Sequence, residues 1–569
     1  MMRLALRMVA PSLVALALAA CGGDEITGPD GPDGPCAVTE LLPGEHSVFE
    51  GSAAVDCIGL PAAATGDEYE VLVTAMSRTL AFNPMELRIT PAGQSLASVP
   101  AVSLETPRAA SAGAEVDRAW RAGQYAWDLR MRRLEAPLLS AIRANAARGG
   151  AGLFAVPAVD DTLEFGFSCI TAEDFPNAPS SITGVVRAVS ARAVVVEDTT
   201  AVGAFTSLEY EGIAANFDDV IYDTDVQYFG APGDIDDNGG RVVLLYAAGV
   251  NNLSEDYNEA FVAGFTCPLD LGFAGGNDAE MFYLMVPDPT GQYTQAAGDA
   301  ITKDQVRRIT DNTVAHEFQH MINAQSGNGG AQDVWLNEGL SHLAEEAVGH
   351  AVNGFDPGAE LGPEELLATQ PRVETFNKYY LNNWFNISQY LAAPEDTAAL
   401  LNAEDPLDFN TFRMRGSAWL FVRYLLDRYE NGTAGEAGRT VALIQSSAAD
   451  SRDAITQVFG TDFDRLATDW ATMLGVEDRS DVTPAAPLTL SSYRLRDVFD
   501  SQIGAVVNPP AGGYPLVPRL RGLGVASTID ANLFTGTGLY VTLRASAAGP
   551  GTELRLVAPG TGATLAASL

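Results

Sequence analysis

The sequence predicts a multidomain α+β protein in which a central mixed domain lies between two all-β regions. At 569 residues the chain exceeds what one hydrophobic core usually organises, while 47% hydrophobic residues and 55 glycines suit packed, turn-rich structure. Short alternating apolar runs between Gly, Pro and Asn turns occupy both ends, whereas helical periodicity dominates from about residue 304 to 478. We therefore expect a β domain over 36–112, a helical connector over 113–149, a mixed domain over 150–480 and a β-sandwich-like domain over 481–569.

The first 35 residues predict a signal peptide and a tether. Arg3 and Arg7 precede an apolar run over 8–20, which is too short for a membrane-spanning helix and typical of a signal-peptide core. The run ends in Leu-Ala-Ala-Cys, which resembles the bacterial lipoprotein box. We expect a signal peptide over 1–20, lipid on Cys21 and a Gly/Pro/Asp tether over 21–35, with an ordinary secretory signal as the alternative.

Either signal places the protein outside the cytoplasm, and the lipoprotein signal places it on the bacterial cell envelope or outer-membrane surface. No later segment has the roughly 18 consecutive apolar residues of a membrane span, so the lipid would be the only membrane contact. In an oxidising compartment the four remaining cysteines predict disulfides. Of three possible pairings we favour Cys36 with Cys57 and Cys169 with Cys267.

The net charge of −39 argues against a nucleic-acid partner, because a phosphate backbone must be met by clustered Lys and Arg. Lys303 and Lys378 are the only lysines in the chain. We interpret the acidity as a source of solubility and not as a preference for basic substrates.

Both terminal regions show the period of two that is typical of strands. Residues 69–73 and 86–89 are apolar runs of this kind, and residues 538–543 and 553–557 repeat the pattern near the C-terminus. Between them, the Ala-, Leu- and Arg-rich stretch 115–147 predicts helix that is broken or kinked at Pro137.

Strands are again predicted over 181–195 and 241–246, with a DxDxNG run between them. Asp234, Asp236 and Asn238 place oxygen donors as in the first half of an EF-type calcium loop, but the twelfth position is Leu245. A calcium site and a tight polar turn are both compatible with this pattern. Further on, residues 417–429 predict a helix whose aromatic residues are packed in the core.

The stretch HEFQH contains two of the five histidines in the chain. On an α-helix His316 and His320 lie on one face about 6 Å apart along the axis and can present both imidazoles to one ion, with Glu317 beside it. Catalytic zinc usually takes a third protein ligand. A second amphipathic helix over 334–346 offers Glu338 and His342 on its polar stripe, and His350 follows.

HEFQH followed by WLNEGLSHLAEE resembles the gluzincin metallopeptidases, and most closely the bacterial hyicolysin family. The resemblance implies a zincin-like metallopeptidase domain over 150–480, zinc bound by His316, His320 and Glu338, and Glu317 as general base. It favours Glu338 over His342 as the third ligand. Glu345 matches a glutamate that orients a ligand histidine in aminopeptidase-like members, whereas His342 stands where thermolysin-like members carry an aspartate.

Spacing excludes the metzincins, which need Gly and His where this chain has Asn323 and Ser326. A zinc ion bound by these residues would lower the pKa of a bound water, which would attack a peptide carbonyl. Glu317 would accept the proton of that water. The sequence does not identify the residue that donates a hydrogen bond to the oxyanion. Related enzymes carry a Tyr or His on a later helix, but this chain has Phe412 where the Tyr would be expected. Tyr379, Tyr380 and Arg415 are the candidates.

The predicted function is therefore a lipid-anchored zinc endopeptidase acting on protein or peptide substrates. The alternating side chains of 279–286 predict an edge strand that would pair with an extended peptide. One alternative is an inactive cell-surface binding lipoprotein in which the zinc is structural. Another is an aminopeptidase, although no GxMEN-like anchor for a substrate amine precedes the HExxH helix.

Overall fold

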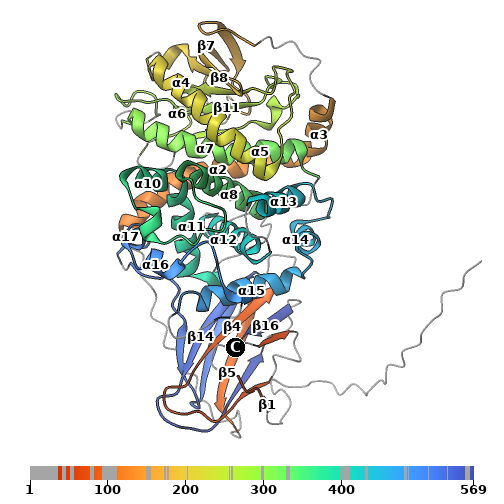
Figure 1. Ribbon diagram of the computed structural model, residues 1–569, viewed down its shortest axis with the longest axis vertical. Coiled ribbons are helices and arrows are strands. Elements are labelled where there is room, and N and C mark those ends of the chain that lie inside the picture. The colour runs from red at the N-terminus through yellow and green to blue at the C-terminus, as the bar shows by residue number, and fades with distance from the viewer. Residues whose placement is uncertain are drawn as a thin grey trace, which may run out of the picture.

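The computed structural model (Figure 1) covers most of the chain beyond the predicted tether. It describes residues 36–41, 47–50, 57–76, 82–92, 112–148 and 156–568, the last range without 172, 174, 176–177, 202, 256, 258–260, 296–299, 329–332, 397–399, 401–410, 430–432, 480–483, 485, 511, 535 and 558–563. The predicted signal peptide, Cys21 and the tether lie outside the described residues. Over the described ranges, no helix combines the length and apolar character needed to cross a membrane.

Two five-stranded sheets form a β-sandwich at one end of the molecule (Figure 1). One sheet has the order β1-β3-β15-β5-β13 and the other β12-β14-β4-β16-β2. The strands are β1 (Ala37–Val38), β2 (Val48–Glu50), β3 (Ile58–Leu60), β4 (Glu68–Met76), β5 (Phe82–Pro91), β12 (Arg519–Gly522), β13 (Ser527–Phe534), β14 (Thr537–Arg544), β15 (Thr552–Val557) and β16 (Thr564–Ser568).

The two ends of the chain build this sandwich together. β5 pairs antiparallel with β13 and β15, and β4 pairs antiparallel with β14 and β16. Val71 and Val73 from one end and Val541 and Leu543 from the other are buried in the same core. The expectation of separate N-terminal and C-terminal β domains is therefore wrong. Alternation marks a strand but does not identify the strand it pairs with.

A six-stranded mixed sheet lies at the opposite end, in the order β10-β11-β9-β8-β7-β6. Its strands are β6 (Thr162–Gly166), β7 (Ser181–Val189), β8 (Ala193–Asp198), β9 (Val242–Tyr246), β10 (Gly264–Phe265) and β11 (Met281–Leu284). β8, β9 and β11 run parallel, and β10 is antiparallel to β11. Since β11 is paired on both sides, the prediction that residues 279–286 form an edge strand is wrong; the edge is the two-residue β10.

Helices fill the space between the sheet and the sandwich. The longer ones are α2 (Ala112–Glu135), α3 (Leu139–Arg148), α4 (Ser207–Asn216), α5 (Asp223–Phe229), α7 (Lys303–Ser326), α8 (Val334–Asn353), α11 (Leu381–Ala392), α12 (Thr411–Tyr429), α13 (Thr433–Ile444), α14 (Ser451–Phe459) and α15 (Phe463–Val476). The shorter ones are α6 (Ala248–Asn251), α9 (Pro363–Leu366), α10 (Gln370–Thr375), α16 (Leu495–Phe499), α17 (Gln502–Val507), η2 (Ala136–Leu138), η3 (Thr199–Ala201), η4 (Phe217–Tyr222), η5 (Pro268–Asp270), η6 (Phe376–Tyr380), η7 (Pro394–Asp396) and η8 (Ala486–Leu488). The prediction of a mixed α+β chain is confirmed.

The predicted helical connector is two helices, α2 and α3, separated by the turn η2 that contains Pro137. It does more than connect. Tyr125, Trp127 and Met131 of α2 are buried in the same hydrophobic core as α7, α8 and α12. In Figure 1 this helix lies in the middle of the molecule, close to α7 and α8. Asp128 of this helix lies near His316 and Glu317 of α7.

Candidate metal centre

Two buried helices carry the predicted metal ligands. α7 begins at a capping box in which Thr302 and Gln305 exchange hydrogen bonds, and neither Gly nor Pro interrupts it before Gly327. His316 and His320 project from its buried face, and their Nε2 atoms lie 3.2 Å apart. α8 crosses beside it and ends at Gly354, whose φ of +65° a glycine adopts without strain.

Glu338 of α8 brings a carboxylate to both imidazoles. Its Oε2 lies 3.3 Å from His316 Nε2 and 3.7 Å from His320 Nε2. Donor atoms arranged tetrahedrally at zinc–ligand distances are about 3.3–3.4 Å apart. Glu338 is fully buried, and its Oε2 also forms an ion pair with Arg415 Nη1. Three donor atoms with one common focus, one of them from a buried carboxylate, fit a metal ion.

The other ring nitrogens are held by hydrogen-bond partners. His316 Nδ1 lies 2.8 Å from Glu345 Oε1, and His320 Nδ1 lies 3.0 Å from Asn337 Oδ1. A donor hydrogen at Nδ1 leaves the Nε2 lone pair free for a metal. Burial opposes the charge of Glu345, but His342 and His316 outweigh it and lower its pKa to about 2. Glu345 thus holds the His316 ring and Asn337 holds the His320 ring; the contact of Asn337 was not foreseen from the sequence.

The two alternative ligands differ in position. One nitrogen of His342 is within 4.8 Å of donor atoms of His316 and Glu338, although its Nδ1 is engaged by Glu345 Oε1 at 3.0 Å. His350 is directed elsewhere, with its Nδ1 2.9 Å from the Glu346 carbonyl oxygen and 3.1 Å from the Tyr380 hydroxyl. Glu338 thus contacts both imidazoles, and of the two alternative ligands His342 lies near these donor atoms whereas His350 does not.

Glu317 has a carboxylate oxygen within 4.8 Å of a His316 nitrogen and has partners of its own. Its Oε2 accepts a hydrogen bond of 3.1 Å from the Thr266 hydroxyl and lies 4.0 Å from Arg132 Nη2. Burial, reinforced by the charge of Asp128, raises the pKa of Glu317 to about 7. A dication at the neighbouring donors would lower this pKa again.

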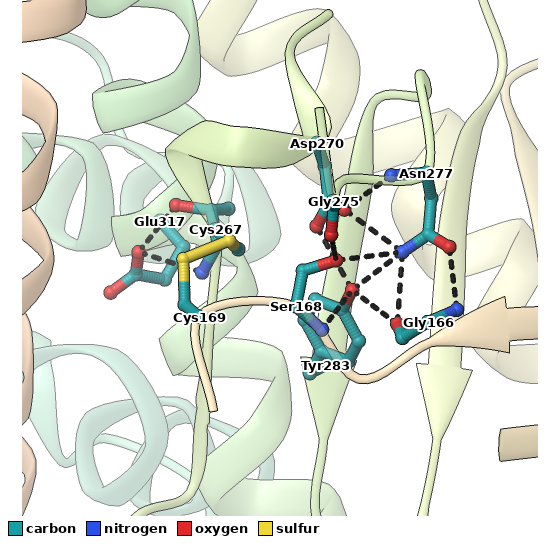
Figure 2. The surroundings of a disulfide bond; sticks show 10 residues. Gly166, Ser168, Cys169, Cys267, Asp270, Gly275, Asn277, Tyr283 and Glu317 are labelled. Atoms are coloured by element: carbon teal, nitrogen blue, oxygen red, sulfur yellow. Dashed lines mark hydrogen bonds between the residues drawn. A yellow bond between two sulfur atoms is a disulfide. The ribbon is translucent and has the colours of Figure 1, made fainter. Parts of the chain in front are cut away.

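A disulfide fixes the segment that holds Glu317. Both favoured pairs form, Cys36–Cys57 with Cα atoms 5.1 Å apart and Cys169–Cys267 with Cα atoms 5.9 Å apart. Cys267 directly follows Thr266, and Figure 2 shows Glu317 next to this disulfide. On its other side Asn277 and Tyr283 hydrogen-bond to Asp270 and to the backbone of Gly166, which ties the ends of β6 and β11 to the loop after β10.

Helix α2 contributes residues that the sequence analysis missed. Asp128 Oδ2 accepts a hydrogen bond of 3.1 Å from Arg415 Nη2, and a carboxylate oxygen of Asp128 lies within 4.8 Å of donor atoms of His316 and Glu317. Arg132, one turn further along, reaches Glu317 and Glu135. Arg121, Tyr125, Asp128 and Arg132 follow each other at helical spacing, so a stripe of polar residues on an otherwise buried helix face was the signal available.

Among the predicted oxyanion donors, the structure brings only Arg415 to the site. Its guanidinium pairs with Glu338, lies 3.5 Å from His316 Nε2 and stacks 4.0 Å above the Tyr125 ring. Tyr380 instead contacts His350, and Tyr379 lies beside it on η6. None of the three residues borders the cleft described next, so it is the contacts with Glu338 and His316 that distinguish Arg415.

A cleft of about 470 Å³ opens onto His316, Glu317 and Glu345. Its walls come from α2, α7, α11 and η6 and from the loop before β10. Gln124 of α2 also covers the edge of the sheet: it accepts from Ala263 N at 2.7 Å and donates to the Gly264 carbonyl oxygen at 2.9 Å. Gln124 thus pairs with one backbone group of β10 and with one of the residue before it, at the edge of the sheet next to the cleft.

The DxDxNG run forms a hydrogen-bonded turn. Asn238 Oδ1 accepts from Arg241 N at 2.6 Å, and Asn238 Nδ2 donates to Asp236 Oδ2 at 2.9 Å. Asp234 and Asp236 have a carboxylate neighbour in Glu280, whose oxygens accept from Ile235 N at 3.1 Å. The Asn238 side chain is therefore engaged in hydrogen bonds of the turn. The third side chain that lies near the carboxylates of Asp234 and Asp236 is Glu280.

A comparison with characterised proteins gives the chain a distant relationship to metalloproteases. The relative is the neutral metalloprotease ShpI of Staphylococcus hyicus, which is 26% identical over 207 residues. The aligned part is 34% of this chain and spans 43% of the length of ShpI. No family model matches the chain.

Proposed function

We propose that the protein is a zinc endopeptidase of the gluzincin type. One observation carries this proposal: the donor atoms of His316, His320 and Glu338 converge at 3.2–3.7 Å from one another. Glu317 is close by and borders an open cleft. A structural zinc site normally has four protein ligands, whereas three ligands and access to solvent are typical of a catalytic one. The relationship to a metalloprotease supports the same activity.

Zinc held by these residues would supply a water of lowered pKa and polarise the scissile carbonyl. Glu317, held by Thr266 and facing the cleft, accepts the proton of the attacking water. It then passes that proton to the leaving amine. Glu345 and Asn337 keep the two imidazoles in the tautomer that this arrangement needs.

Arg415 is the proposed donor to the oxyanion. It is a fixed cation next to the donor cluster, held by Asp128 on one side and by the Tyr125 ring beneath it. A preorganised donor of this kind is typically responsible for a 10²–10³-fold effect on kcat.

Replacing Arg415 by Lys should therefore lower kcat by about 10²-fold, since lysine keeps the charge but loses the planar fork that Asp128 and Tyr125 hold. KM and zinc content should change little. Steady-state kinetics on a quenched fluorescent peptide, with metal analysis of the same sample, measures all three quantities. An unchanged kcat would remove Arg415 from the mechanism.

The proposal extends to location and partners. Two disulfides suit an extracytoplasmic protein, and a lipid on Cys21 would anchor it to the cell envelope. The partner is a protein or peptide substrate. Calcium at Asp234 and Asp236, with Glu280 as the third carboxylate, is a separate proposal that the hydrogen-bonded turn does not require.

The test is a metal analysis paired with a protease assay. The purified protein should hold one zinc per chain, cleave casein and internally quenched peptides blocked at both ends, and lose this activity on chelation until zinc is restored. Cleavage limited to peptides with a free amine would make it an aminopeptidase. Stoichiometric zinc with no cleavage of any substrate would support the binding lipoprotein instead.

A further inference from the structure

The walls of the cleft are cationic in a chain that carries a net charge of −39. Arg121 of α2, Arg308 of α7 and Lys378 of η6 border it. The acidic residues that border it, Asp128, Glu317 and Glu345, all belong to the floor and have roles there. A substrate therefore meets positive charge on the walls before it reaches the floor.

Two of the cations, buried Arg121 and exposed Arg308, lie on different helices at similar spacings along the chain from residues of the floor. Arg121 precedes Asp128 by seven residues on α2, and Arg308 precedes His316 by eight on α7. At 1.5 Å per residue these spacings correspond to about 10–12 Å from the floor. An extended peptide covers that distance in three or four residues.

The positive charge of the walls is only partly neutralised. Lys378 Nζ lies 2.7 Å from Asp311 Oδ2, but the same carboxylate is 3.6 Å from Arg307 Nη2, so one negative charge is shared between two cations. Arg308 is exposed and has no acidic partner among the described residues.

We propose that the enzyme prefers peptides that carry Asp or Glu three or four residues from the scissile bond. This inference rests on the proposed peptidase function and specifies its substrate class. Cations along a narrow cleft focus the field there, so that an acidic side chain is attracted locally although the rest of the protein repels it. Salt should weaken the preference, because Arg308 is exposed to solvent.

The test uses quenched peptides of one sequence in which Glu, Gln or Lys stands at the third or fourth position on either side of the cleaved bond. At low salt the wild-type protein should cleave the best Glu peptide about five- to tenfold more efficiently, by kcat/KM, than its Lys counterpart. The preference should shrink towards unity in 0.5 M salt, where screening is about three times shorter in range than at 0.05 M.

Arg308→Glu should reverse the ratio of Glu to Lys peptide cleavage. The matched control is Lys303→Glu on the same helix, which changes the charge equally but pairs with Glu209 away from the cleft and should keep the ratio. Equal cleavage of Glu and Lys peptides by the wild type, or the same ratio in Arg308→Glu, would overturn the proposal while leaving the peptidase function intact. Failure of the zinc-loaded protein to cleave casein and every peptide of the set would instead count against the peptidase function.

Discussion

Glu317→Gln should lower proteolysis by at least 10²-fold and leave bound metal in place. Glu317 is beside the three donor atoms, and its own contacts are with Thr266 and Arg132, so its loss removes a proton acceptor and no ligand. General acid–base catalysis typically contributes 10²–10⁴-fold, and we expect kcat to fall within that range. Glutamine has nearly the same shape, and its amide oxygen can still accept from the Thr266 hydroxyl, so the fold should persist.

The measurement is casein and quenched-peptide cleavage together with zinc content per chain. Glu374→Gln is a matched control, because it makes the same chemical change at an exposed position of α10. Among the described residues, the Glu374 carboxylate accepts a hydrogen bond from Gln370 alone. The control should keep full activity. Cleavage by Glu317→Gln within a few fold of wild type would exclude Glu317 as the general base, and loss of zinc would make it a ligand instead.

Local patterns predicted the two helices of the candidate metal centre because its residues are close in sequence. His316 and His320 are one helical turn apart, and Glu338 and Glu345 stand on the next helix, so helical periodicity and a short connection largely determine their meeting. Asn337 precedes Glu338 in the sequence, but its contact with His320 depends on how α7 and α8 cross and could not be predicted from the spacing.

Contacts between distant segments could not be predicted in this way. Asp128 and Arg415 are 287 residues apart, and their pairing depends on how α2 docks against α12. The β-sandwich joins strands that are more than 400 residues apart, such as β4 with β14. β10 has only two residues, Gly264 and Phe265, too few to show any periodicity, and so the edge of the mixed sheet was assigned to the wrong strand.

Glu338→Gln should deprive the protein of zinc and therefore of all activity. The carboxylate supplies the only negative charge among the three proposed ligands, and its uncharged replacement binds a dication poorly. Replacing groups that merely orient ligands costs 10–100-fold in metal affinity, so loss of a ligand should cost about 10²-fold or more. The fold should be retained in part, because Arg415 keeps Asp128 as a partner.

His342→Gln is the control that separates the two possible third ligands. If Glu338 binds the metal, His342→Gln should keep one zinc per chain, since Glu345 still holds His316, whereas Glu338→Gln should lose it. Metal analysis after dialysis against a weak chelator, with circular dichroism on the same samples, distinguishes loss of metal from loss of fold. If Glu338→Gln kept one zinc per chain and His342→Gln contained none, His342 and not Glu338 would be the third ligand. The zinc would then have three neutral ligands, and its bound water would have a lower pKa.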